Sequence, residues 1–359
     1  RAYQEIYNEF YRDQNLEAKV EQGYGSGIIG NPERSACLTL RYRCWEKDYF
    51  TSCLPFAQRG GEVGIPVDWN YYIPVRMESA LGAQGASGPL SLSVNGELED
   101  STNVKVNVQN LEENGVSVPI TELRKAARLQ EYLELMARGG SRYVEQLKSI
   151  FGVTSSDARL QRPEYLGGGK NPVVISETLS TVPTDLGNSP QGNMSGHGIS
   201  VGKSNSFKKR FEEHGHIIGI MSVMPRTSYQ QGLNRSWTRF DKFDHYIPQF
   251  AHIGEQEVLN KEIFQNIEDP TNEETFGYQS RYAEYKYKES SVHGDFRDTL
   301  NYWHMGRIFD SENESSPPVL NKDFVQSAPT QRVFAVTDPD ENKLYVQIYN
   351  RVKAIRPMP

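Results

Sequence analysis

The feature that most constrains this chain is the spacing of its apolar stretches, which are few, short and separated by long irregular segments. The run IIGIMSVM at 217–224 is almost continuously apolar and predicts a strand buried on both faces. Alternating or apolar residues predict further strands at 173–176, 279–288, 332–337 and 344–355. Helices do not alternate with these strands, which argues against a Rossmann or TIM-barrel design. The pattern favours a mainly β fold of antiparallel strands with long insertion loops, and a sandwich or jelly roll would close such sheets.

Two consecutive helices are expected at 120–152. Thr121 can cap a first helix whose apolar positions run from Leu123 to Met136, and a glycine pair ends it. A second helix is expected at 141–151, ended by a glycine. The residues at 1–17 predict another short helix, since Ile6 and Phe10 lie four apart. The segment 120–152 is therefore interpreted as a helical insertion.

The segment before these helices, 56–119, differs in character because Gly and Pro recur along it. Two alternating stretches flank Asn95-Gly96 within it, a pattern typical of a hairpin. We expect this segment to form an insertion exposed on the outer surface. The residues at 37–53 mix aromatic and basic side chains around Trp45 and are interpreted as an extended arm.

The irregular segments are rich in aromatic residues, with 20 Tyr and 15 Phe in 359 residues. Such side chains fit either a Tyr-rich β core or extensive contact between subunits. Long aromatic and Arg-rich segments cannot all pack on one small barrel, so neighbouring copies of the chain are expected to bury them. The net charge is −7, whereas a protein that neutralises a genome alone is usually basic. If this chain encloses DNA, another component must carry most of the counter-charge.

No catalytic residue, metal site or cofactor is predicted. The three cysteines, Cys37, Cys44 and Cys53, fit neither a disulfide framework nor a common zinc spacing. His214 and His216 would share one face of a strand, but pairs of histidines are common by chance. No nucleophile motif of a hydrolase is present, and no apolar run approaches the length of a membrane span.

Basic residues among aromatic ones mark two candidate surfaces for single-stranded nucleic acid, where cations bind phosphates and rings stack on bases. The candidate residues are Lys208, Lys209, Arg210, Arg281, Lys286 and Lys288. On a strand at 279–288, Tyr282, Lys286 and Lys288 would share a face with Glu284, which would need a basic neighbour among phosphates. A third basic cluster surrounds Trp237. A solvated strand face or a subunit interface would explain the same clusters.

Several long strings resemble a known family when taken together and in order. They are WEKDYFTS at 45–52, DARLQRPEYLGG at 157–168, YQQGLN at 229–234, AHIGEQ at 251–256, FGYQ at 276–279, RYAEY at 281–285 and IRPMP at 355–359. The chain resembles the major capsid proteins of the gokushovirus branch of Microviridae, small single-stranded DNA phages. The resemblance runs along the whole chain and is weakest at 56–119.

The resemblance implies one jelly-roll capsid subunit over 1–359, a fragment of a longer chain, that builds a T=1 icosahedral shell around circular single-stranded DNA. It implies that 56–119 forms a surface protrusion at the threefold axes, used in host attachment. Implied partners are further copies of the chain, the genome, a small basic DNA-packaging protein, a minor or pilot protein and a host receptor. The virion, assembled in the bacterial host cytoplasm, is the expected location, with no membrane insertion. The rival interpretation is a β-rich carbohydrate-binding or carbohydrate-active protein, which would need two carboxylates facing each other across a cleft.

Overall fold

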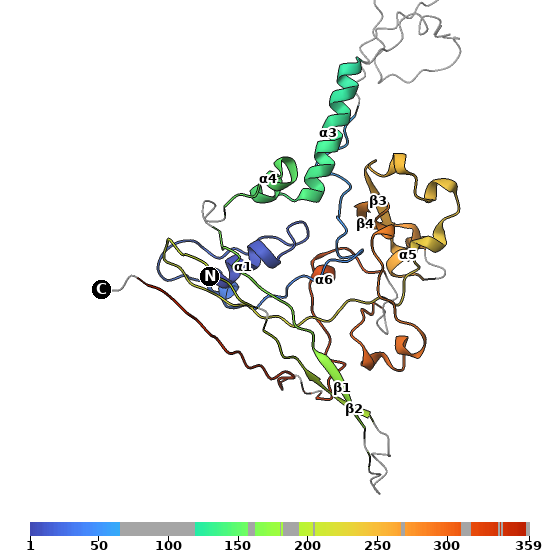
Figure 1. The fold of residues 1–359 in the computed structure, drawn as a ribbon. Coiled ribbons are helices and arrows are strands. Elements are labelled where there is room, and N and C mark those ends of the chain that lie inside the picture. The colour runs from blue at the N-terminus through green and yellow to red at the C-terminus, as the bar shows by residue number, and fades with distance from the viewer. Residues whose placement is uncertain are drawn as a thin grey trace, which may run out of the picture.

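The computed structural model describes residues 1–64, 119–156, 162–179, 181, 194–203, 205–266, 270–309, 317–336, 338 and 340–356 (Figure 1). The helices are α1 (Ala2–Ile6), the π-helix η1 (Tyr7–Tyr11), α2 (Glu33–Leu38), α3 (Ile120–Gly139), α4 (Tyr143–Phe151), α5 (Asn260–Ile263) and α6 (Lys322–Val325). The strands are β1 (Val174–Leu179), β2 (Met194–Ile199), β3 (Glu255–Leu259) and β4 (Thr275–Ser280). Short 3-10 helices are η3 (Arg235–Thr238), η4 (Lys242–Asp244), η5 (Pro248–Phe250), η6 (Pro270–Glu273), η7 (Ala283–Tyr285), η8 (Gly294–Arg297) and η9 (Asn301–Trp303).

The described strands form two antiparallel sheets of two strands each. In the first, β1 pairs with β2 from Val174 opposite Ile199 to Leu179 opposite Met194. In the second, β3 pairs with β4, and the register shifts between Val258 and Leu259. The strand predicted at 173–176 is confirmed in β1. These small sheets are compatible with a viral capsid fold without defining a jelly roll.

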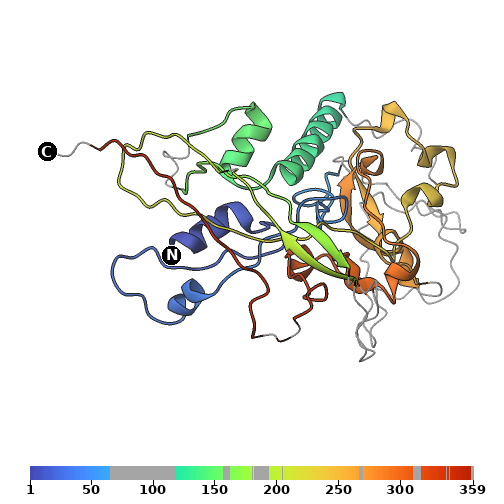
Figure 2. The same cartoon turned by 60° about the horizontal axis from the view of Figure 1, so that its bottom comes forward.

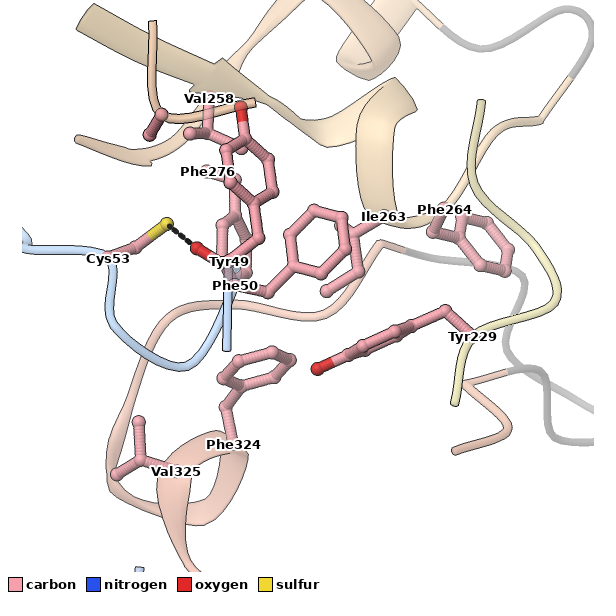
Figure 3. Close-up of a cluster of buried hydrophobic side chains, with 11 residues drawn as sticks. Tyr49, Phe50, Cys53, Tyr229, Val258, Ile263, Phe264, Phe276, Phe324 and Val325 are labelled. Carbon is pink, nitrogen blue, oxygen red and sulfur yellow. Dashed lines mark hydrogen bonds between the residues drawn. The ribbon is translucent and has the colours of Figure 1, made fainter. Parts of the chain in front are cut away.

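The hydrophobic core packs against the second sheet, as Figure 3 shows. Phe50 lies at its centre, with its ring centroid 4.8 Å from that of Tyr229. Phe276 of β4 contacts Phe324 of α6 at 5.0 Å, also edge to face, which is a favoured geometry for aromatic pairs. The buried cluster consists of Tyr49, Phe50, Cys53, Tyr229, Val258, Ile263, Phe264, Phe276, Ala283, Phe324 and Val325. We call this cluster, with β3, β4, α5 and α6, the compact region.

The interpretation of 37–53 as an extended arm is wrong for its second half. The side chain of Asp48 accepts hydrogen bonds from the backbone N–H groups of Phe50 and Thr51, at 3.1 and 2.8 Å. This local turn closes the WEKDYFTS string on itself and directs Tyr49 and Phe50 into the core. A short acceptor side chain in the middle of the string thus replaces an extended backbone with a turn.

The strands predicted at 217–224, 332–337 and 344–355 are not formed by their described residues. The segment 217–224 is also not buried on both faces, since Ile217 exposes 60% of its surface. Apolar alternation identifies side chains that need burial, whereas a strand also needs a neighbouring backbone to pair with. We call β1, β2 and the segments 205–224 and 340–356 the extended region. In Figure 2 its C-terminal segment runs from near β1 and β2 toward the edge of the molecule opposite β3 and β4.

Both helices predicted at 120–152 are present, as is the short helix near the N-terminus. Thr121 does not cap α3, because this helix already starts at Ile120, after Pro119. Gly140 ends it with φ 92°, a conformation that favours glycine. In Figure 1, α3 extends away from the compact region. None of the helices in the described ranges is long and apolar enough to cross a membrane. Of the predicted insertion at 56–119, residues 65–118, with the predicted hairpin, lie outside the described residues.

Candidate assembly and nucleic-acid interfaces

The β1–β2 hairpin presents apolar side chains on an unsupported two-stranded sheet. Every residue of β1 is exposed, and Ile175 exposes 68% of its surface. A two-stranded hairpin is only marginally stable in water, and its open edges offer unpaired N–H and C=O groups to another strand. The hairpin therefore has the properties of a surface that is completed by further strands.

The C-terminal segment 340–356 has the same character. Leu344, Val346 and Ile348 alternate along it and would share one face of a strand. All three are exposed, and so are Tyr345 between the first two and Tyr349 after the third. Contiguous exposed apolar residues mark interaction surfaces, and Tyr is enriched where proteins contact one another. This segment is thus a second surface suited to contact with another chain or strand.

The first group of predicted nucleic-acid residues, Lys208, Lys209 and Arg210, is exposed in the extended region. The ammonium group of Lys209 forms an ion pair with Glu164 at 2.5 Å, in which both side chains are partly exposed. Exposed pairs of this kind contribute little to stability, so the Lys209 ammonium stays accessible to a competing phosphate.

The second group lies in the compact region, but not on one strand. The strand predicted at 279–288 is wrong beyond β4, because Tyr282 adopts the left-handed conformation with φ 63° and η7 follows at once. Lys286 and Lys288 are exposed after this turn. Arg281 is half-buried, with its guanidinium 5.8 Å from the ring centroid of Phe250. No hydrogen bond or ion pair between described residues joins the two predicted groups.

Glu284, which would repel a phosphate strand, is neutralised by basic neighbours. It pairs with Arg239 at 3.2 Å and accepts a hydrogen bond from the side chain of Gln256 at 2.6 Å. Arg235 lies 4.0 Å from the same carboxylate. Glu284 therefore has the basic neighbour that it would need beside phosphates. Arg235 and Arg239, which belong to the basic cluster around Trp237, are themselves paired with acidic side chains.

A buried polar network joins the compact region to η3. The phenol of Tyr49 donates to Glu262 at 2.9 Å, and Arg235 contacts the other oxygen of the same carboxylate at 2.9 Å. Burial raises the pKa of Glu262, and this effect outweighs the opposing influence of Arg235. The sequence contained no signal for this network, because its members lie up to 213 residues apart.

His214 and His216 are both exposed in the extended region. Within the described ranges, no group of three or more His, Cys, Asp or Glu side chains is arranged to hold a metal ion. The cysteines at 37, 44 and 53 are free thiols.

The chain is similar to known proteins along its entire length. The family described as "Capsid protein (F protein)" matches residues 1–359. Capsid protein VP1 of Bdellovibrio phage phiMH2K is 35% identical over 392 residues, which cover 100% of this chain and 70% of that protein. Capsid protein VP1 of Chlamydia phage 1 is 35% identical over 443 residues, with 100% and 72% covered. Capsid protein VP1 of Spiroplasma virus 4 is 30% identical over 405 residues, with 100% and 71% covered.

Proposed function

Since the chain belongs to the capsid protein (F protein) family, which makes it a structural protein of a phage virion, we propose that its copies assemble into a T=1 icosahedral shell around circular single-stranded DNA. The chain is not an enzyme. The alternative of a carbohydrate-binding or carbohydrate-active protein finds no support in these relatives.

The observation that supports assembly is the exposed apolar surface of the extended region. Ile175 in β1 and Ile348 in the C-terminal segment each expose about two thirds of their surface, at 68% and 65%. Burying such side chains contributes roughly 25 cal/mol for each Å² removed from water, so each favours association. In our proposal, β1 and β2 are strands of a jelly-roll body that becomes complete in the shell. The apolar run at 217–224 and the stretches at 332–337 and 344–355, which the sequence predicts as strands, would complete this body.

The insertion at 56–119 is proposed to form the threefold protrusion and to contact a host receptor. Its described flanks support this, because residues 56–64 run beside α3. The backbone N–H of Arg59 donates to Leu133 of α3 at 3.4 Å, and the side chains of Gln58 and Gln130 are hydrogen-bonded. Since α3 extends away from the compact region, its N-terminal end is a suitable base for a projecting loop (Figure 1). Deleting residues 85–110 should leave assembly possible and impair attachment, and loss of folding on deletion would contradict the proposal.

The six basic candidates are proposed to contact the genome together with a small basic packaging protein, which would supply the counter-charge that a chain of net charge −7 lacks. A minor or pilot protein would complete the particle. Exposed Lys208, Lys286 and Lys288 can each approach a phosphate without breaking a buried ion pair. A density map of filled particles that places all six side chains between subunits or on the outside would contradict this part.

The proposed shell is tested by expressing the chain, separating the product on a sucrose gradient and imaging it in negative stain. We expect closed particles of uniform size, and circular single-stranded DNA that withstands nuclease in particles formed in infected cells. A product that remains monomeric at high concentration, or particles that protect double-stranded DNA, would overturn the proposal.

A further inference from the structure

A cavity of about 420 Å³ lies where the N-terminal helix, the segment 43–54 and the junction of α3 and α4 meet. This volume falls within the range of small-molecule sites in proteins. Five cationic side chains line it, namely Arg12, Arg43, Lys47, Arg138 and Arg142. Asp13 is the one acidic residue among the described residues of the lining, and Phe10, Tyr11 and Trp45 supply aromatic surface. Its lining therefore combines positive charge with aromatic rings.

Three of the five cations form ion pairs with carboxylates of the chain. Lys47 pairs with Asp13 at 2.9 Å, and Arg142 pairs with Glu145 at 3.2 Å. Arg138 forms an ion pair with the buried carboxylate of Glu255. These ion pairs hold parts of the folded chain together, so the three cations that form them have little positive charge left to bind a ligand.

Arg12 and Arg43 are different, because neither has a carboxylate partner among the described residues. Arg12 donates to the backbone carbonyl of Glu17, and Arg43 donates to the hydroxyl of Ser222 at 3.1 Å. The Arg43 guanidinium also lies 5.2 Å from the ring centroid of Tyr11. In both arginines the Nε–H is buried and finds no acceptor in the part of the chain that the structure describes, so these residues satisfy neither guanidinium fully.

The electrostatics of Arg12 show that the local charge is unbalanced. Burial and then repulsion from Arg142 lower its pKa, and the nearby carboxylates of Glu17, Glu9 and Asp13 do not offset these two effects. An anion entering the cavity would relieve this repulsion.

We propose that this cavity binds a nucleotide of single-stranded DNA, with Arg12 and Arg43 on its phosphate and the base beside the aromatic lining. Guanidinium groups bind phosphate oxygens through charge-assisted hydrogen bonds, and aromatic side chains hold bases without reading their identity. A carboxylate of another subunit would use the cations but not the rings, and it would fill little of 420 Å³. The inference rests on the proposed function, since it takes the enclosed genome as the source of the nucleotide.

The test is isothermal titration of the purified full chain, freed of nucleic acid, with thymidine 5′-monophosphate, inorganic phosphate and thymidine. We expect the nucleotide to bind more tightly than phosphate and thymidine to bind least. Arg12→Gln and Arg43→Gln should each weaken nucleotide binding about tenfold or more, which is the effect of losing one hydrogen bond to a charged group. Arg124→Gln, which removes an exposed arginine of α3, is the matched control and should leave binding unchanged.

Two further variants separate loss of the site from loss of the fold. Ser222→Ala removes the hydroxyl that holds Arg43 but keeps the cation, so binding should stay within about threefold, a change near RT in free energy. Arg43→Lys keeps the charge and should retain part of the affinity. Equal binding by Arg12→Gln, Arg43→Gln and Arg124→Gln would overturn the proposal. Thymidine or phosphate binding as tightly as the nucleotide would do the same, as would tighter binding of a poly-glutamate peptide.

The outcome for the cavity can be distinguished from that for the shell. If the chain forms particles that protect single-stranded DNA but does not bind the nucleotide, only the proposed nucleotide site is refuted. A chain that binds the nucleotide through Arg12 and Arg43, but forms no DNA-containing particle, would refute the proposed shell function alone.

Discussion

The compact and extended regions contain similar apolar residues but bury them to very different degrees. Val258 and Ile263 of the compact region are completely buried, whereas Ile348 and Tyr345 of the extended region expose 65% and 100% of their surface. In the compact region, side chains from four distant parts of the chain meet around Phe50. In the extended region, β1 and β2 pair only with each other, and residues 340–356 pair with no strand among the described residues.

The difference separates two sources of stability within one subunit. The compact region gains its stability from contacts that the chain makes with itself, so it should respond to mutation like an ordinary protein core. The extended region has apolar surface whose burial depends on further strands or neighbouring subunits. Mutations there should leave the subunit's own folding almost unchanged and alter assembly instead.

The strongest test of the comparison is Phe50→Ala. The ring of Phe50 is buried and contacts Tyr229 and Phe276. Its removal should lower the free energy of unfolding by about 3–5 kcal/mol, because the lost transfer free energy adds to the cost of the cavity left behind. Urea unfolding followed by far-ultraviolet circular dichroism measures this difference.

Phe240→Ala is the matched control for Phe50→Ala. Phe240 exposes 92% of its surface, so the same truncation should change the free energy of unfolding by about 0.5 kcal/mol or less. Similar losses for the two variants would mean that the cluster around Phe50 is not the centre of stability.

Sequence patterns predicted the helices better than the core. Helices α3 and α4 depend on local features, such as apolar periodicity and the glycine that follows each one, so reading them required no knowledge of the tertiary fold. The core could not be predicted in the same way, because the turn made by Asp48 moves Tyr49 and Phe50 from an expected arm into the interior. The run at 217–224 has the composition of a core strand, but pairing depends on backbones that periodicity does not identify.

A smaller effect is expected from Tyr49→Phe, which removes the phenol that donates to the buried carboxylate of Glu262. Losing a hydrogen bond to a charged group should lower the free energy of unfolding by about 1–3 kcal/mol. The loss should be greater at pH 7 than at pH 4, because the phenol favours the ionised form of the carboxyl. Tyr302→Phe, which removes the hydroxyl of a half-exposed tyrosine, is the control and should change little at either pH.

The pH dependence of Glu262 has a definite sign. Because burial raises its pKa in the folded chain, its contribution to stability is complete below the unfolded pKa near 4 and is lost as pH rises through the folded pKa. Glu262→Gln should therefore remove part of the decline in stability between pH 4 and pH 7. A wild-type and a Gln variant with parallel stability profiles over this range would contradict the assignment.

The candidate site residues illustrate the same limit of sequence reasoning. Lys208, Lys286 and Lys288 are exposed, as a basic surface requires. Their exposure could be predicted from their charge alone, because lysine side chains are rarely buried. The strand face that Lys286 and Lys288 were predicted to share with Tyr282 is not formed, because the left-handed Tyr282 ends the extended backbone. The sequence carried no signal for Arg12 and Arg43, because their lack of a carboxylate partner among the described residues can be recognised only in three dimensions.

The smallest effect on the subunit itself, and the sharpest contrast between the two regions, is expected from Ile348→Asp. Ile348 already faces water, so the free energy of unfolding should change by about 0.5 kcal/mol or less. In the shell the same aspartate would have to be buried without a partner, which costs far more than the loss of an apolar contact. Even 1.4 kcal/mol of this cost reduces an association constant tenfold, so the subunit concentration needed for assembly should rise by at least that factor and the yield of particles on a sucrose gradient, at a fixed concentration, should fall. Gln347→Asp introduces the same charge at the neighbouring, opposite-facing position and should reduce the yield much less. Equal yields from the two variants would show that the alternating face of 344–348 is not an assembly surface, and the contrast between the regions would then rest on the β1–β2 hairpin alone.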